Sequence, residues 1–323
     1  MGAAISLEAT RPLPQSSRVL PAFLTAILWA ISIVCASQSA KQLGGSEANF
    51  WRLVVATMLL ALWAHTCGQG LRGDSFPLFL MSGVIGVGSD VFLFQALPRI
   101  GSRLSLLIIQ CSAALFAALV EWLWLGTRIS GRQAAACVII LAGVAMALAP
   151  GQHLNVKRGA LAAGICFGLL AGFGNGLGAV LSRKANAVAE AAHQNIDGGT
   201  AAYQRLIGGL FVAGVCLLVV KRREIAAQVT HASPPRLPPT EKWRRVWPWV
   251  LANAFAGQTL GVTCYQWALK TTRSGLVLAI VATTPLVVIP FARVVEGEKI
   301  EPRSVVGGIV AVVGVILLVV VGT

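Results

Sequence analysis

The chain has 323 residues, of which 56% are hydrophobic and 12% are charged, and its mean hydropathy is +0.76. An average soluble domain carries about 25% charged residues, so this chain has too few polar side chains to cover a water-soluble surface. Its formal net charge of +14 comes from basic residues dispersed through short loops. There they anchor helix ends to lipid headgroups, and they give no reason to expect nucleic acid as a partner. A soluble globular protein is therefore excluded.

Ten apolar runs follow one another along the chain, each of about 20 residues and thus long enough to cross a hydrocarbon core of about 30 Å. In the first half they are expected at residues 21–43, 49–67, 75–97, 102–125 and 133–149. In the second half they are expected at residues 159–181, 201–220, 246–269, 274–295 and 304–321. Glycine and proline mark the breaks, as at Gly44, Pro98 and Pro302. The sequence predicts an all-α integral membrane protein with ten transmembrane helices.

The two halves of the chain repeat one another. Residues 94–108 return 172 positions later as residues 266–280, with six of fifteen identical, and Arg52-Leu53 return 153 positions later as Arg205-Leu206. The chain therefore divides into an N-terminal tail at 1–18, a first repeat at 19–150 and a second repeat at 157–322, with a basic, proline-rich loop at 221–245. Because each repeat holds five spans, an odd number, the second copy is inverted in the bilayer, as in many secondary transporters.

Short motifs within the repeats resemble a known family. They are Trp51-Arg52-Leu53 in the second span, its echo Gln204-Arg205-Leu206 in the seventh, the junctions Ala96-Leu97 and Ala268-Leu269, and the turn at 297–300. In order and spacing they are similar to the EamA-type branch of the drug/metabolite transporter superfamily, from residue 21 to residue 321. The resemblance implies a ten-helix carrier that exports or exchanges small metabolites, and it names no substrate. Thr127 stands where the family has an acidic turn residue in the first half.

Asp90 is the one acidic residue well inside a predicted span. A carboxylate near the middle of a membrane costs about 2.5–3.5 kcal/mol on insertion scales, so it is kept only where it faces protein or water. One hypothesis is that Asp90 binds a cationic group or exchanges a proton; the other is a structural hydrogen bond to a neighbouring helix. Glu121 lies near the end of its span beside Trp122 and Trp124, and we expect it at the membrane interface.

The second half has no matching acid, because a shift of 172 positions carries Asp90 onto Val262. Its eighth span instead offers Gln258, Tyr265 and Gln266, which share one broad helix face. Gln95 lies at the equivalent depth in the third span. Amides, hydroxyls and aromatic rings suit a cavity for a small polar or amphipathic molecule, although interhelical hydrogen bonding would explain each residue singly.

Three further positions complete the predicted lining: Trp29, Asn175 and Thr283, with Ser32, Gln38, Gln110 and Ser112 as weaker candidates. Asn175 belongs to a span whose glycines recur every four residues from Gly164 to Gly176, a spacing that permits close helix packing. For Arg52 and Arg205 one hypothesis is that they gate the pathway or attract anions; the favoured one is that they reach the headgroups. The eight candidate residues for substrate binding are Trp29, Asp90, Gln95, Asn175, Gln258, Tyr265, Gln266 and Thr283.

These features predict a secondary transporter that moves a small polar or amphipathic metabolite, such as an amino acid or a drug-like molecule, by alternating access. We expect export across the cytoplasmic membrane, with Asp90 as the candidate coupling residue if protons drive the transport. A passive channel is the main alternative. A carrier of phosphorylated sugars would need two or more basic residues deep in the helices, and none is found beyond Arg52 and Arg205.

An intramembrane enzyme is disfavoured, because all four histidines fall at or beyond helix ends. The seven cysteines are predicted to act as small hydrophobes, so no catalytic residue, metal or cofactor is expected. The expected partners are a small-molecule substrate, the lipid bilayer and, under the coupling hypothesis, protons; a monomer and a homodimer both remain open. We expect a multi-pass protein of a bacterial inner membrane. Its orientation stays open, since nine basic residues lie on the side of the N-terminus and fifteen on the other.

Overall fold

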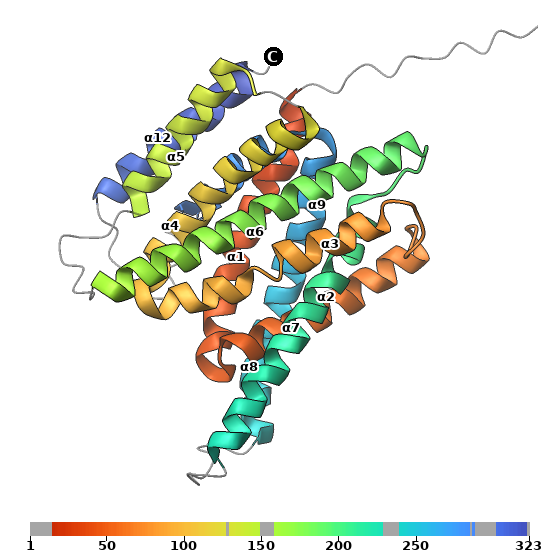
Figure 1. Ribbon diagram of the computed structural model, residues 1–323, viewed down its shortest axis with the longest axis vertical. Coiled ribbons are helices and arrows are strands. Elements are labelled where there is room, and N and C mark those ends of the chain that lie inside the picture. Colours follow the sequence, from red (N-terminus) through yellow and green to blue (C-terminus); the bar gives the residue numbers. More distant parts are fainter. Residues whose placement is uncertain are drawn as a thin grey trace, which may run out of the picture.

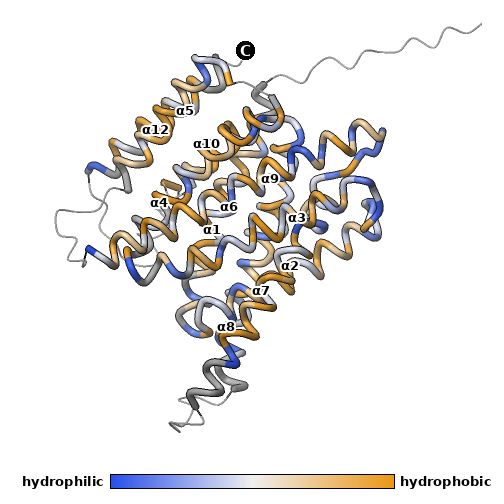
Figure 2. The backbone as a smooth tube through the Cα atoms, in the orientation of Figure 1, coloured by the Kyte–Doolittle hydropathy of each residue, from blue (hydrophilic) through white to orange (hydrophobic). Residues whose placement is uncertain are grey.

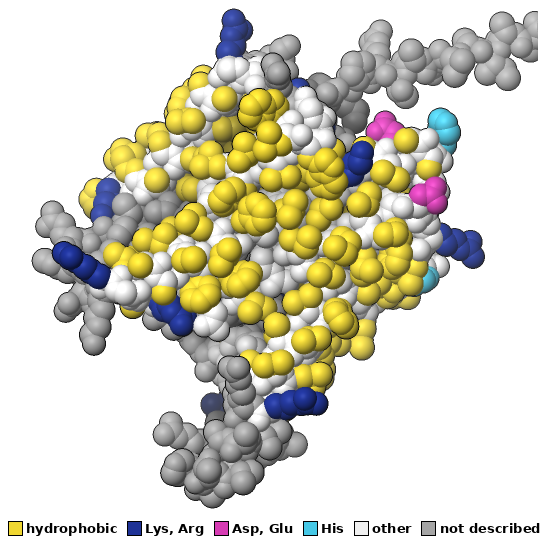
Figure 3. Space-filling view, viewed as in Figure 1, with side chains coloured by type: hydrophobic (Ala, Val, Ile, Leu, Met, Phe, Trp, Pro, Cys, Tyr) yellow, Lys and Arg dark blue, Asp and Glu magenta, His cyan; other side chains and the backbone are white. Residues whose placement is uncertain are grey.

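The computed structural model describes residues 15–126, 129–148, 158–228, 239–284, 286–287 and 302–321, and within these ranges all regular secondary structure is helical. Six helical segments are long and apolar enough to cross a membrane, by length and composition, and two shorter apolar helices accompany them. Apolar residues dominate the helices in Figure 2 and cover the middle of the face in Figure 3, with charged side chains near its ends. The prediction of an all-α integral membrane protein is confirmed.

The helices follow the predicted order of spans (Figure 1). The first repeat contains α1 (Gln15–Leu43), α2 (Gly45–Thr66), α3 (Phe76–Gly86), α4 (Asp90–Leu125) and α5 (Gly131–Leu148). The second contains α6 (Arg158–Ala191), α7 (Gly198–Gln228), α8 (Pro239–Asn253), the π-helix η1 (Ala254–Gly261), α9 (Val262–Thr271), α10 (Ser274–Val281) and α12 (Pro302–Val321). Each of the ten predicted spans holds at least one of these helices, and the eighth is a continuous stretch of α8, η1 and α9.

Helix α6 lies between α3 and α4, and its glycines set both contacts (Figure 1). A Cβ added at any of the four glycines from Gly164 to Gly176 that recur every four residues would lie 2.0–2.9 Å from atoms of α4. A Cβ added at Gly174 would lie 2.4 Å from Ser89, and one at Gly178 would lie 2.7 Å from Gly86. No other residue type leaves room for helices this close, so the stripe is a packing surface.

Helices of the two repeats also pack directly against each other. Helix α2 packs on α7, α3 on α7, α1 along α8, η1 and α9, and α5 on α12, which Figure 1 shows side by side. In the last pair a Cβ on Gly143 would lie 2.5 Å from the backbone nitrogen of Ala311. One apolar core cluster surrounds Ile140 and Ile280, and another surrounds Leu53 and Leu206. Each cluster draws side chains from both repeats, so the repeats form one packed bundle.

Two local features correct the predicted boundaries. The break in the third span falls at residues 87–89, where the run of glycines weakens the helix, and the backbone is then helical from Asp90 to Leu125, through the predicted break at Pro98. The loop predicted at 221–245 is helical at both ends, because α7 runs to Gln228 and α8 begins at Pro239. Thr127 and the turn at 297–300 lie outside the described residues.

Candidate functional site

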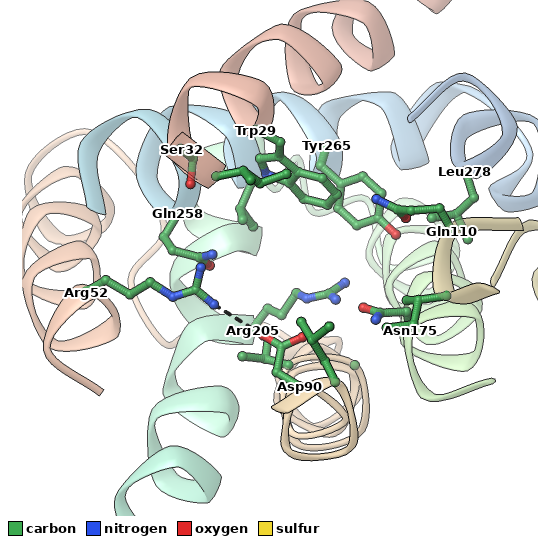
Figure 4. A pocket seen from close by; sticks show the side chains of 16 residues that line it. Trp29, Ser32, Arg52, Asp90, Gln110, Asn175, Arg205, Gln258, Tyr265 and Leu278 are labelled. Atoms are coloured by element: carbon green, nitrogen blue, oxygen red, sulfur yellow. Dashed lines mark hydrogen bonds and ion pairs between the residues drawn. The ribbon is translucent and has the colours of Figure 1, made fainter. Parts of the chain in front are cut away.

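A cavity of about 170 Å³ lies between the two repeats (Figure 4). Helices α1, α2, α3 and α4 of the first repeat and α6, α7, η1, α9 and α10 of the second surround it. Its polar lining consists of Ser32, Arg52, Asp90, Gln110, Asn175, Arg205 and Gln258, together with the rings of Trp29 and Tyr265. Because nine helices contribute, the cavity exists only when both repeats are packed together.

The cavity lining follows the internal repeat. Gly86 and Gln258, Asp90 and Val262, and Leu93 and Tyr265 are lining pairs, each separated by the same 172 positions. Arg52 and Arg205 form a fourth pair, separated by 153 positions. Equivalent residues of inverted repeats meet where the pseudo-two-fold axis passes between the halves. The cavity therefore lies at the interface of the repeats, on the axis that relates them.

The aromatic wall of the cavity is built on the π-helix η1. Trp29 donates from Nε1 to the carbonyl oxygen of Gly257 at 3.2 Å, and its ring centroid lies 5.3 Å from that of Tyr265. Helix α1 can approach this closely because a Cβ on Gly261 would lie only 2.6 Å from Trp29 Cδ1. π-Helical segments are rare and occur mostly at functional sites. Here the segment carries Gln258, which lines the cavity.

Arg52 and Asp90 form an ion pair on the cavity wall, drawn as a dashed line in Figure 4. Arg52 Nη2 lies 3.2 Å from Asp90 Oδ2, and Arg52 Nε donates to Asn49 Oδ1 at 2.8 Å. The side chains of Arg52 and Asp90 are 16% and 20% exposed. The expectation that Arg52 would reach the headgroups is wrong, because the carboxylate holds it at the cavity.

Arg205 is the second cation of the cavity, and it is 5% exposed. Its Nη1 donates to Ser182 Oγ at 3.2 Å, and its guanidinium carbon lies 5.4 Å from the ring centroid of Tyr265. It fits against α3 because Gly86 has no side chain; a Cβ there would lie 2.6 Å from Arg205 Nη2. Across the described ranges, no acidic side chain comes within 4.0 Å of Arg205. The expected headgroup position is wrong here too, since α3 and α7 pack together over this residue.

The two arginines are the cavity residues that sequence reasoning missed. The available signal was the repeat itself, because Arg52 and Arg205 occupy equivalent positions in the two halves. Inverted repeats bring equivalent positions together near their axis, so a matched pair of charges inside two spans points to the interface between the repeats. A single arginine near one helix end would carry no such signal.

Five of the eight candidate residues line the cavity: Trp29, Asp90, Asn175, Gln258 and Tyr265. Of the weaker candidates, Ser32 and Gln110 line it as well, whereas Gln38 and Ser112 do not, and Figure 4 shows Gln110 and Asn175 on one side of it. The structure thus brings together candidate residues from five different helical segments. That they bind a substrate stays a prediction.

Gln95, Gln266 and Thr283 do not line this cavity. Gln95 is exposed, and its Oε1 accepts a hydrogen bond from Arg99 Nη1 at 3.0 Å. Gln266 is buried behind the wall, where its Nε2 donates to Ser182 Oγ at 3.2 Å. Thr283 donates from Oγ1 to the carbonyl oxygen of Ile280 at 2.7 Å. Adjacent helix positions point about 100° apart, so Tyr265 faces the cavity while its neighbour Gln266 faces another helix.

Glu121 is buried, and its expected position at the membrane interface is wrong. It is 2% exposed, and its Oε1 lies 2.8 Å from Arg183 Nε. Its Oε2 accepts the backbone N–H of Ser274 at 2.8 Å and also accepts a hydrogen bond from the Ser274 hydroxyl. The last turns of α4 pack against α6 and α10, which cover the carboxylate. Glu121 therefore ties three helices together.

A second carboxylate, Asp197, caps the start of α7 at the same end of the bundle. Its Oδ1 accepts the backbone N–H groups of Gly199 and Thr200 at 2.8 and 3.0 Å, and also Trp63 Nε1 of α2 at 3.0 Å. Burial alone would raise the pKa of the Asp197 carboxyl, but hydrogen bonds from Thr200, Trp63 and Gly199 bring that pKa below its ordinary value. We call this region, where α6 joins α7 and α9 joins α10, the Asp197 end.

The fold and the cavity define a multi-pass membrane protein in which two inverted repeats enclose a polar cavity. The model of the EamA-like transporter family matches residues 17–149 and 162–320, once in each half. The chain therefore belongs to the EamA-like transporter family and is a membrane transporter of the drug/metabolite transporter type. The predicted resemblance to this family is confirmed.

The same fold occurs in a solved structure described as "Crystal structure of protein". It superposes with a TM-score of 0.70, covering 95% of this chain and 97% of that chain, at 16% sequence identity. At this identity the likeness concerns the fold alone. No curated protein matches the chain.

Proposed function

We propose that the protein is a secondary transporter that exports a small polar or amphipathic metabolite across a bacterial cytoplasmic membrane by alternating access. The observation that carries this proposal is a cavity lined by equivalent residues of both repeats, the pair Arg52 and Arg205 above all. In transporters with inverted repeats, the substrate site lies near the middle of the membrane between the halves. Exchange of the two conformations between the halves then opens one site to either side.

The size and lining of the cavity support a metabolite of modest size. A buried water needs roughly 10–15 Å³ measured in the same way, so a cavity of about 170 Å³ holds on the order of ten non-hydrogen atoms. One wall is aromatic, through Trp29 and Tyr265, and the facing side chains are amides and charged groups. A molecule with one apolar and one polar part suits such a lining.

Contacts at the Asp197 end favour a carrier over a passive channel. Between the cavity and that end, Ser182 is hydrogen-bonded to Arg205, to Gln266 and to Ser82, the last at 2.7 Å. These hydrogen bonds join four helices. Farther out, Lys270 Nζ donates to Asn195 Oδ1 at 2.7 Å, and Glu121 ties α4, α6 and α10. We propose that these layers close one route out of the cavity, as alternating access requires, whereas a channel needs a route open at both ends.

Asp90 is the residue that we propose for proton coupling. Its carboxylate borders the cavity, pairs with Arg52 and keeps one-fifth of its side chain exposed. A carboxylate in this position can exchange a proton with water in the cavity and switch its attraction for Arg52 on and off. Protonation would thereby change the polar contacts of α2 with α4 in step with transport.

The test is uptake into proteoliposomes of a labelled panel of amino acids and small amphipathic metabolites, with and without an imposed pH gradient. We expect gradient-driven accumulation by the natural protein, loss of accumulation in Asp90→Asn, and unchanged accumulation in Glu47→Gln. Glu47 is a suitable control because it pairs with Lys221 outside the cavity. Equal thermal unfolding of the variants in detergent would exclude a folding defect. Flux without accumulation or counterflow would contradict the carrier proposal, and accumulation by Asp90→Asn would contradict proton coupling. Vesicles of known sidedness would test the direction.

A further inference from the structure

We propose that the transported molecule carries a single carboxylate group and that Arg205 binds this group in the cavity. The inference rests on the proposed transport function and names the substrate class for the same cavity. Its basis is an imbalance among the charged groups that border the cavity, together with the surroundings of Arg205.

The charged groups on the cavity wall do not cancel. They are Arg52, Arg205 and Asp90, so the lining carries a net charge of +1 with all three ionised. Arg52 is paired with Asp90 at 3.2 Å, whereas no acidic side chain in the described ranges comes within 4.0 Å of Arg205. A cation that is only 5% exposed is costly unless a charge of opposite sign accompanies it. The structure therefore leaves one positive charge for an anion to balance.

The contacts of Arg205 leave it able to bind that anion. A guanidinium offers five N–H donors; Ser182 accepts from Nη1, and the ring of Tyr265 lies 5.4 Å from the guanidinium carbon. Both partners are neutral side chains, so neither supplies the missing charge. Figure 4 shows the guanidinium between Asp90 and Tyr265, pointing toward Asn175 and the open part of the cavity. A planar guanidinium binds a carboxylate with two parallel hydrogen bonds.

The charge balance favours a carboxylate over a phosphate group. A carboxylate group carries one negative charge, which balances that of Arg205, whereas a phosphate monoester carries about −1.5 to −2 near pH 7. With phosphate, the cavity would hold an excess of negative charge beside Asp90. The same cavity offers an aromatic wall of Trp29 and Tyr265, which suits an apolar group on the carboxylate-bearing molecule.

The experiment compares matched ligands that differ only at the carboxyl group. The probes are leucine and phenylalanine, their primary amides, 3-phenylpropionate and a phenyl phosphate monoester. Each is tested for a ligand-induced shift in the thermal unfolding of the detergent-solubilised protein. Each is also tested as a competitor of whichever labelled panel compound the proteoliposomes accumulate. The variants are Arg205→Gln, Arg205→Lys and, as a control, Arg222→Gln, which removes an exposed arginine of the same helix outside the cavity.

We expect carboxylates to bind at least ten times more tightly than their amides, and Arg205→Gln to weaken carboxylate binding about 30-fold or more. Arg205→Gln should leave amide binding unchanged, Arg205→Lys should keep part of the preference, and Arg222→Gln should match the natural protein. A purely structural role of Arg205 would instead lower stability without changing the ratio between carboxylate and amide.

Several outcomes would overturn the carboxylate site. They are equal binding of carboxylates and amides, a preference that survives Arg205→Gln in folded protein, tighter binding of the phosphate monoester, or no thermal shift with any carboxylate. Accumulation of amides without preference would overturn this site and leave the carrier proposal standing. A carboxylate shift that depends on Arg205, without accumulation of any compound, would support the site and contradict the carrier.

Discussion

Replacing Glu121 by alanine should destabilise the Asp197 end of the bundle. The substitution removes the partner of Arg183, at 2.8 Å, and the acceptor for the backbone N–H of Ser274. That N–H belongs to the first residue of α10, where no carbonyl of the same helix can accept it. The site is closed by packing, so water cannot readily replace the lost carboxylate.

The expected loss follows from the burial of the three groups. Breaking a fully buried ion pair costs about 3–5 kcal/mol, but the Arg183 side chain is 23% exposed, and solvent screening reduces its share. Leaving the buried Ser274 N–H without an acceptor costs about 1–3 kcal/mol. Together the two effects predict a loss of roughly 2–4 kcal/mol in the free energy of unfolding. Glu121→Gln keeps an acceptor for Ser274 and loses only the charge, so it should cost about half as much.

Thermal and denaturant unfolding in detergent, followed by tryptophan fluorescence, would measure these losses. Glu47→Gln provides the matched control, because its ion pair with Lys221 is 3.7 Å long and more exposed; an exposed pair contributes about 0–1 kcal/mol. The expected order of stability is natural protein, then Glu121→Gln, then Glu121→Ala. If the free energies of unfolding of Glu121→Ala and Glu47→Gln agreed within about 0.5 kcal/mol, the buried contacts of Glu121 would not stabilise the fold and the reasoning would fail.

Three further substitutions, of which Gly159→Ala is a control, test the packing and the capping. Gly172→Ala places a Cβ 2.0 Å from Ser112 Oγ and should cost about 1–3 kcal/mol. Gly159→Ala meets nothing within 4 Å and should be neutral or stabilising in the same unfolding measurement. Asp197→Ala removes the cap of α7 and should cost about 1 kcal/mol. The folded-state pKa of Asp197 lies below its unfolded value, so its contribution is present above about pH 4 and is lost as the pH falls through the folded pKa. Unfolding curves from pH 3 to 7 should show this loss in the natural protein and not in Asp197→Ala.

The architecture could be predicted because membrane spans and internal repeats can be recognised from the order of residues along the chain alone. Run length gave the order of the membrane spans, and the odd count of spans per repeat gave the inversion. The break at 87–89 and the π-helix at 254–261 could not be predicted in the same way. Both features depend on how closely two helices pack, as α1 packs against Gly261. This packing involves segments that lie far apart in the sequence.

The cavity could be predicted in part, since polar residues inside apolar runs must face protein or water. That rule finds Asp90, Asn175 and Gln258 but gives no direction around the helix, so it also selects Gln266 and Thr283, which bond elsewhere. A charged residue nearer the end of a span, such as Arg205 or Glu121, can be stabilised in two ways. Its side chain can reach the lipid headgroups, or it can bind a polar partner inside the bundle. Only the packed bundle decides between them.

The pairing of Asp90 with Val262 across the repeat has a thermodynamic consequence. Under the proposed alternating access, if the two halves were identical, the inward-open and outward-open conformations would be related by the two-fold axis and equal in free energy, and only gradients would set the direction of net movement. A carboxylate on one half and an isopropyl group on the other remove that degeneracy, because the pair with Arg52 experiences a different surrounding in each conformation. A difference of about 1.4 kcal/mol already makes one conformation ten times more populated. Under that proposal, the divergence at this position of a duplicated chain contributes to a preferred resting side of the empty transporter.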